Sequence, residues 1–291
     1  MSQKTYAGQP VIRLNNGIDI PALGFGVWQI EDQKVCEDTV VKAIQTGYRM
    51  IDTAAIYQNE IGVGKAIQNS GVSREELFIT SKLWVQDFGY EKAKAAFQKT
   101  LDRLQLDYLD MYLIHWPCGD FLGSWKAMEE LYHEGKIKAI GVCNFTVEKM
   151  EELKANLEIV PVVNQIELHP IFQQKELQVY NKENNIVTQP WSPLGNGNAE
   201  LLNNKSLKVI AEKHNKTVPQ VILRWHLQEG FCVIPKSVTP SRIEENFNVF
   251  DFELSGEEMD IVRSLDTNER IFFDPKDPEW EQKMLNVVVD I

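Results

Sequence analysis

The chain has 291 residues, of which 43% are hydrophobic and 25% are charged, so it is long enough to bury a large core. Its 42 acidic and 30 basic residues give a formal net charge of −12, which argues against general affinity for nucleic acid or anionic membranes. Because it has no apolar run of about 18 residues, no apolar leader in residues 1–10 and no CxxC pair, we expect a cytoplasmic protein with reduced thiols and no membrane span.

The first predicted element is a β-hairpin over residues 11–21, because two alternating runs flank the turn sequence Asn15-Asn16-Gly17. After it, short apolar segments rich in β-branched residues alternate with amphipathic helical stretches, which is typical of a parallel sheet buried on both faces. The strand-like segments number eight: ALGFGVW (22–28), YRMIDTA (48–54), LFITSKL (77–83), YLDMYLIH (108–115), IKAIGVCNF (137–145), VVNQIEL (162–168), IVTQPWSP (186–193) and FCVIPKS (231–237).

Eight such units predict a closed (β/α)8 TIM barrel that residues 1–291 form as a single domain. An open doubly wound sheet is the alternative, but its glycine-rich GxGxxG turn is missing after the first strand. Beyond the eighth unit we expect one more helix with Ser255 as its N-cap. The tail from residue 268 is aromatic and interrupted by two prolines, so we expect it to pack across the barrel.

Four polar residues stand at or just after the ends of consecutive predicted strands. Asp52, Lys82 and His115 end the second, third and fourth strands, and Tyr57 follows in the turn after Asp52. The C-terminal ends of parallel strands meet at one rim, so these side chains are expected to lie together. A lysine beside a tyrosine lowers the pKa of the phenol, and a neighbouring histidine can direct a carbonyl group. The four residues therefore predict a site that protonates a carbonyl oxygen; a purely structural ion pair between Asp52 and Lys82 is the plainer alternative.

Two long stretches and five shorter motifs between them resemble the signatures of the aldo-keto reductases. The long stretches are GYRMIDTAAIYQNEIGVG (47–64) and IPKSVTPSRIEENFNVF (234–250), and SKLW, LIHWP, GVCNF, NQIELHP and WSPLG lie between them in the family's order. The short form of the chain and its QPWSPLG motif are similar to the bacterial 2,5-diketo-D-gluconate reductase branch. The resemblance implies NADPH as cofactor, a monomer, and small aldehydes and ketones, including keto sugar acids or dicarbonyls, as substrates.

The same resemblance assigns roles to the four residues at the rim. It implies that Tyr57 is the general acid during reduction and that Lys82 lowers the pKa of Tyr57. It further implies that Asp52 orients Lys82 and that His115 aligns the substrate carbonyl. No pair of the remaining histidines has the spacing of metal ligands, so we predict no metal site.

A cation-rich segment at the end of the eighth strand is the candidate site for the cofactor's phosphate. Lys236, Ser237 and Arg242 lie there, and the planar fork of arginine suits bidentate contact with a phosphate group. Ordinary surface charge is the alternative. The resemblance implies that Lys236 and Arg242 hold the 2′-phosphate, which selects NADPH over NADH, and that Glu245 and Asn246 contact the adenine.

The nicotinamide end of the cofactor needs amide partners and a flat surface. Asn144 and Gln165 end the fifth and sixth strands and offer amide groups, while Trp191 ends the seventh and can stack on the ring. Core packing is the alternative for Trp191. By resemblance, the cofactor contacts also include Ser192, Leu194, Val238 and Cys143. A serine is usual at position 143, and Met50 likewise replaces a frequent histidine and is expected to face the helices.

Tryptophans near the strand ends are the candidate substrate pocket. Trp28, Trp84 and Trp116, together with Phe272 and Phe273 of the tail, predict an apolar throat suited to small carbonyl compounds, although packing at the barrel end is the alternative. Two other functions remain open on the sequence. One is a Schiff-base aldolase that uses Lys82, although a neighbouring aspartate keeps a lysine protonated and non-nucleophilic. The other is a non-catalytic subunit that binds the cofactor.

Overall fold

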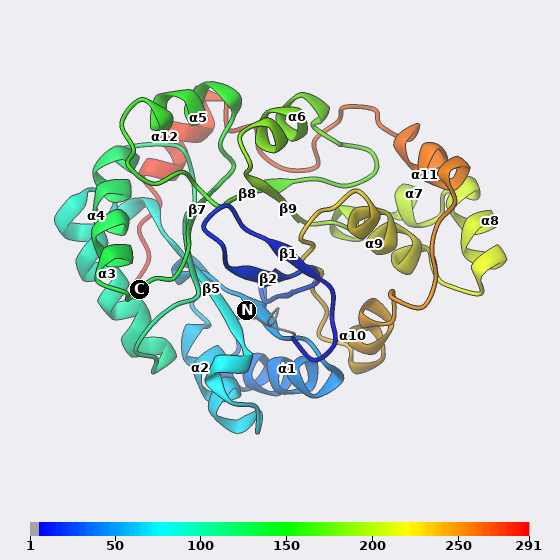
Figure 1. Cartoon of the computed structure of the whole chain (residues 1–291), viewed down its shortest axis with the longest axis horizontal. Helices are drawn as coiled ribbons and strands as arrows, with labels where there is room; N and C mark the ends of the chain where they lie inside the picture. Colours follow the sequence, from blue (N-terminus) through cyan, green and yellow to red (C-terminus); the bar gives the residue numbers. More distant parts are fainter. Residues whose placement is uncertain (1–5, 291) are drawn as a thin grey trace.

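A computed structural model describes residues 6–290 and shows parallel strands surrounded by helices, which confirms the predicted barrel (Figure 1). Its spatial strand order follows the chain order, so each strand pairs in parallel with the next one along the chain. The strands of this sheet are β3 (Phe25–Gly26), β4 (Met50–Asp52), β5 (Phe78–Leu83), β6 (Met111–Ile114), β7 (Ile140–Cys143), β8 (Val163–Glu167) and β9 (Val187–Trp191).

The eighth predicted strand closes the barrel without forming a regular ladder. On the β9 side, the N–H of Cys232 donates to the Thr188 carbonyl at 3.2 Å. On the β3 side, the N–H of Gly26 donates to the Pro235 carbonyl at 3.0 Å. Proline has no N–H, so Pro235 interrupts the ladder and leaves the segment 231–237 as an irregular closing strand.

The N-terminal hairpin is confirmed and closes one end of the barrel. β1 (Val11–Arg13) pairs antiparallel with β2 (Asp19–Pro21), and Figure 1 shows the hairpin over the middle of the ring of strands. Its Ile20 is fully buried in a cluster with Met50 and Phe78 from the barrel strands. The hairpin is therefore a plug at the end of the barrel away from the strand C-termini.

Met50 points into the barrel, so the expectation that it faces the helices is wrong. Its sulfur lies 3.8 Å from the Gln189 amide nitrogen and 4.0 Å from the Cys232 sulfur, on strands across the barrel. Successive residues of a strand face opposite sides, and Ile51 belongs to the hydrophobic layer beneath the helices. Met50 and Asp52 consequently share the inner face of β4.

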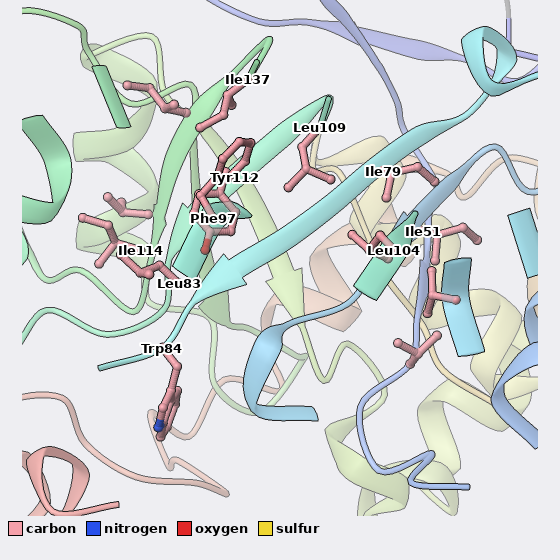
Figure 2. Packing of buried hydrophobic residues seen from close by; sticks show 14 of the residues in the cluster. Ile51, Ile79, Leu83, Trp84, Phe97, Leu104, Leu109, Tyr112, Ile114 and Ile137 are labelled. Atoms are coloured by element: carbon pink, nitrogen blue, oxygen red, sulfur yellow. The ribbon is translucent and has the colours of Figure 1, made fainter. Parts of the chain in front are cut away.

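Helices cover the outside of the barrel and pack on the outward-facing strand residues. Figure 2 shows Phe97 and Leu104 of one helix in the same cluster as Ile79 and Tyr112 of the sheet. The Phe97 and Tyr112 rings meet edge to face, with their centroids 5.1 Å apart. The helices are α1 (Gln33–Thr46), α2 (Glu60–Asn69), α3 (Tyr90–Leu104), α4 (Phe121–His133), α5 (Val147–Lys154), α6 (Lys175–Glu183), α7 (Ala199–Leu202), α8 (Lys205–His214), α9 (Val218–Gln228), α10 (Pro240–Phe247), α11 (Gly256–Arg263) and α12 (Pro278–Leu285).

The C-terminal part follows the sequence expectations and adds one helix. Ser255 caps α11 through a capping box with Glu258, in which each side chain accepts from the other residue's backbone N–H. The tail contains the additional helix α12, and Trp84 donates its indole N–H to the Val287 carbonyl at 3.2 Å. The tail thus lies across the rim of the barrel. Within residues 6–290, none of the helices has the length and apolar character needed to cross a bilayer.

The expectation that residues 1–10 form no apolar leader concerns in part residues 1–5, which lie outside the described residues.

Candidate active site

A cavity of ≈ 810 Å³ opens at the rim where the strands end. Strands, loops, α10 and the tail all contribute to its walls. Most of the predicted site residues line it: Trp28, Asp52, Tyr57, Trp84, His115, Trp116, Asn144, Gln165, Trp191, Ser192, Leu194, Lys236, Ser237, Arg242, Glu245, Asn246, Phe272 and Phe273. Three predicted residues, Lys82, Cys143 and Val238, do not line it.

Lys82 lies behind the cavity wall and is enclosed by oxygen acceptors. Its Nζ lies 2.5 Å from Asp52 Oδ1, 2.9 Å from the Thr53 carbonyl oxygen and 3.4 Å from Tyr57 Oη. The Lys82 and Asp52 side chains are only 1% and 4% exposed. Burial is the largest single influence and lowers the pKa of Lys82, but the Asp52 carboxylate, together with Tyr57 and Cys143, raises the pKa above its usual value. Lys82 is therefore a charged ammonium group held within reach of the Tyr57 hydroxyl.

Burial and Lys82 shift the pKa of Tyr57 in opposite directions. Burial has the larger effect and raises this pKa to about 12, while Lys82 lowers it. The predicted influence of Lys82 is therefore present, but the net shift is upward because the phenol is buried. Tyr57 keeps part of its surface open to the cavity and carries its proton there at neutral pH.

His115 completes the group of Asp52, Tyr57, Lys82 and His115, called the tetrad below. Burial, with a smaller contribution from the Lys82 charge, holds the pKa of His115 well below its usual value, so the imidazole is neutral. Its ring meets those of Tyr57 and Trp84 edge to face at centroid distances of 5.7 Å and 5.2 Å. The ring is consequently held between two aromatic side chains on the cavity wall.

A hydrogen bond links Asn144, which follows β7, to Trp191, which ends β9 on the other side of β8. The Trp191 indole N–H donates to Asn144 Oδ1 at 2.9 Å, and Asn144 Nδ2 donates to the His115 carbonyl at 3.1 Å. Asn144 and Ser192 also have left-handed backbone conformations, with φ of 62° and 51°. Such conformations are uncommon outside glycine and persist where surrounding contacts hold them, which here fixes the side chains at the rim.

Another part of the cavity wall carries positive charge that has no ion-pair partner among residues 6–290. Lys236 and Arg242 are exposed, and neither forms an ion pair within the described part of the chain. Partial burial lowers the pKa of Lys236. The adjacent α10 begins after Thr239 with no side-chain cap. Pro240 has no N–H and the Arg242 N–H donates to the Thr239 carbonyl at 3.0 Å, so the N–H of Ser241 is the group that this turn can offer to an anion. We call Lys236, Arg242 and the start of α10 the phosphate end.

Aromatic side chains form one side of the cavity. Phe272 of the tail meets Trp191 at a centroid distance of 5.0 Å and Trp28 at 5.6 Å, both edge to face. We call these three rings the aromatic wall. Beside it, Phe273 stacks on Trp280 at 3.5 Å with nearly parallel planes.

The sequence profile of the aldo/keto reductase family matches residues 22–267. The chain belongs to the aldo/keto reductase family. It is 55% identical over 261 residues to a glyoxal reductase of Bacillus subtilis (strain 168), covering 89% of this chain and 94% of that protein. It is 47% identical over 272 residues to the methylglyoxal reductase DkgA of Escherichia coli (strain K12), covering 92% and 98%.

Crystal structures of other family members share the fold. An aldo/keto reductase from Brucella melitensis superimposes with a TM-score of 0.86 and 50% identity, covering 89% of this chain and 100% of that one. The Bombyx mori aldo-keto reductase in complex with NADP has a TM-score of 0.86 and 34% identity, covering 91% and 95%. This aldo/keto reductase is thus an NADP-dependent oxidoreductase that acts on carbonyl groups, as the sequence predicted.

The residues of this aldo/keto reductase fit NADPH at both ends of the cofactor. The phosphate end offers two cations that have no carboxylate partner within the described part of the chain, which suits an added phosphate group. The other end offers the Trp191 ring and the fixed amides of Asn144 and Gln165. Those groups can stack on a flat ring and pair with a carboxamide.

Two residues assigned to the cofactor by resemblance lie away from the cavity. Cys143 is fully enclosed in the barrel interior, and burial raises the pKa of its thiol. Its position does not support the expected contact with the carboxamide. Val238 is 48% exposed and lies just before α10.

Gln189 is a site residue that the sequence reasoning missed. Gln165 Nε2 donates to Asp52 Oδ2 and to Gln189 Oε1, both at 2.8 Å. Gln189 in turn lies 3.2 Å from the Cys232 sulfur, so this amide chain connects the tetrad to the closing segment. A glutamine two residues before Trp191 was the available signal, because the two residues share a face of the strand.

Proposed function

We propose that this aldo/keto reductase reduces small aldehydes and α-dicarbonyl compounds, such as glyoxal and methylglyoxal, with Tyr57 as the proton donor. The single observation that carries the proposal is the 3.4 Å approach of Lys82 Nζ to the hydroxyl of Tyr57 in the cavity wall, beside the neutral His115. Two relatives at 55% and 47% identity are named glyoxal and methylglyoxal reductase, which supports the dicarbonyl class.

The cofactor supplies a hydride when it is bound. Lys236 and Arg242 would hold its 2′-phosphate, and Glu245 and Asn246 would contact its adenine, since all four line the cavity. Trp191 would stack on the nicotinamide ring. The phosphate end and Tyr57 line the same cavity, so one extended ligand could contact both and place its reactive ring beside Tyr57.

Proton transfer follows from the charges around Tyr57. Its raised pKa keeps the proton on the phenol until negative charge develops on the substrate oxygen. The Lys82 ammonium then stabilises the phenolate that remains, and Asp52 keeps that ammonium in place. The neutral His115 would donate a hydrogen bond to the carbonyl oxygen and align it toward the phenol.

The position of Lys82 argues against the aldolase alternative. A Schiff base requires a neutral amine that reaches the substrate carbonyl. Lys82 is 1% exposed, does not line the cavity and is held charged by Asp52 at 2.5 Å. The assembled tetrad in turn argues against a subunit that only binds the cofactor.

The test is a panel assay of NADPH oxidation with glyoxal, methylglyoxal and simple aldehydes. We expect turnover of the dicarbonyls by the wild-type enzyme, with the alcohol as product. Borohydride added with substrate should leave no covalent adduct on Lys82. Absence of dicarbonyl turnover would refute the substrate class, whereas a trapped adduct at Lys82 would favour the aldolase.

A further inference from the structure

A buried carboxylate outside the tetrad connects the barrel to the tail. Glu167 ends β8, and its side chain has 0% exposure. Its Oε1 accepts hydrogen bonds from the backbone N–H of Ile271 at 2.7 Å and from that of Phe272 at 3.3 Å. The same oxygen lies 3.1 Å from His169 Nε2. One atom of the barrel therefore binds two consecutive amides of the tail.

The buried environment of Glu167 makes its hydrogen bonds to the tail amides important for the carboxylate as well as for the tail. Its other oxygen, Oε2, has no hydrogen-bond partner among residues 6–290, and the nearest cation, Arg270, lies 3.7 Å away. A buried carboxylate is unfavourable unless hydrogen bonds and charges compensate it. Much of that compensation comes from the tail, which supplies the Arg270 cation and the N–H groups of Ile271 and Phe272. Displacing the tail would therefore leave the buried Glu167 carboxylate without these hydrogen bonds and this cation.

The tail residues held in this way form part of the substrate pocket. Phe272 provides the middle ring of the aromatic wall, between Trp191 and Trp28. All three rings line the cavity. The orientation of the Phe272 ring depends on its own backbone, and Glu167 fixes that backbone at the N–H of the same residue.

We propose that Glu167 is a positioning residue for substrate specificity: its carboxylate holds the Ile271 and Phe272 amides and so keeps the aromatic wall in place. Substrates with an aromatic ring contact the wall, whereas glyoxal, the smallest dicarbonyl, hardly reaches it. Glu167 therefore affects KM for aromatic aldehydes and leaves glyoxal reduction largely unchanged. The proposal rests on the proposed carbonyl reduction at the tetrad.

The first test compares Glu167→Gln with the wild type on glyoxal and on an aromatic aldehyde. An amide keeps the shape but is a weaker acceptor, so KM for the aromatic aldehyde should rise about fivefold with kcat nearly constant. Glu148→Gln is the matched control, because Glu148 pairs with Lys276 of the same tail at 3.0 Å while both side chains are largely exposed. That control should behave as the wild type.

The second test separates positioning from a general effect on stability. If Glu167 acts through the wall, Glu167→Gln should add little to the KM change caused by Phe272→Ala. Full additivity, or equal changes for glyoxal and the aromatic aldehyde, would overturn the proposal. Failure of the wild type on every carbonyl would instead overturn the proposed function, so the two failures are distinguishable.

The third test needs no enzymatic activity, and its first measurement uses the wild-type enzyme alone. Amide hydrogen exchange of the wild-type enzyme should show the Ile271 and Phe272 amides to be better protected than the other amides of residues 268–277. In Glu167→Gln their protection should fall, and in Glu148→Gln it should persist. Rapid exchange of both amides in the wild type would overturn the proposal even if Glu167→Gln did not fold.

Discussion

The tetrad and the phosphate end differ in how their positive charges are buried and paired. Lys82 at the tetrad is 1% exposed and has a carboxylate at 2.5 Å. Lys236 and Arg242 at the phosphate end are exposed, and neither has an ion-pair partner within the described residues. Under the roles proposed above, the protein itself compensates the charge that assists proton transfer. The charge proposed to bind the cofactor has no such partner, so the ligand would provide the counter-charge.

Removing Lys82 should break the tetrad most severely. Lys82→Met leaves the Asp52 carboxylate buried without its cation, and breaking a buried pair in this way costs about 3–5 kcal/mol. We expect unfolding at a much lower urea concentration and loss of carbonyl reduction. The control is Lys34→Met, since Lys34 forms an exposed pair with Asp38 at 2.6 Å and its removal should change little. Similar urea midpoints for both variants would contradict a pre-compensated charge.

Removing the Tyr57 hydroxyl should abolish proton donation and leave the phosphate end intact. Tyr57→Phe keeps the ring, so we expect kcat to fall by about 10²–10⁴-fold, as for other general acids. Fluorescence titration should give an NADPH Kd close to that of the wild type. Turnover near the wild-type rate would remove Tyr57 from the mechanism.

Removing Arg242 should weaken NADPH binding, the property that Tyr57→Phe leaves unchanged. A charge-assisted contact with phosphate is worth about 1.5–3 kcal/mol, so Arg242→Ala should weaken NADPH binding by about 10–150-fold. NADH, which has no 2′-phosphate, should bind almost as before. If the binding of NADPH and of NADH weakens equally, the charge of Arg242 has a structural role.

A smaller effect is expected at Cys143, which belongs to neither end. In Cys143→Ser the hydroxyl would be enclosed without an evident partner, so we expect a stability loss of about 1–2 kcal/mol. The NADPH Kd should stay the same, because Cys143 does not line the cavity. Tighter NADPH binding without a lower melting temperature would restore the carboxamide contact expected from the sequence.

The sequence predicted those features that depend on local pattern and strand direction. The hairpin, the barrel and the meeting of Asp52 with Lys82 follow from alternation and from parallel strands. The pKa of Tyr57 did not, because it depends on burial as well as on Lys82, and burial is a property of the folded cavity. Gln189 was missed because it lies two residues before the end of its strand, whereas the sequence argument used only residues at strand ends.

Because the segment 231–237 closes the barrel, we expect the barrel to be completed late during synthesis and folding. Its Cys232 sulfur lies 3.3 Å from the carbonyl of Pro21, a residue 211 positions earlier. Contacts between such distant residues form slowly, and the C-terminal end leaves the ribosome last. Until then β3 and β9 are open sheet edges, which are sites for pairing with other chains. Because Lys236 lies on this segment, a nascent or truncated chain has no complete phosphate end before the barrel is closed.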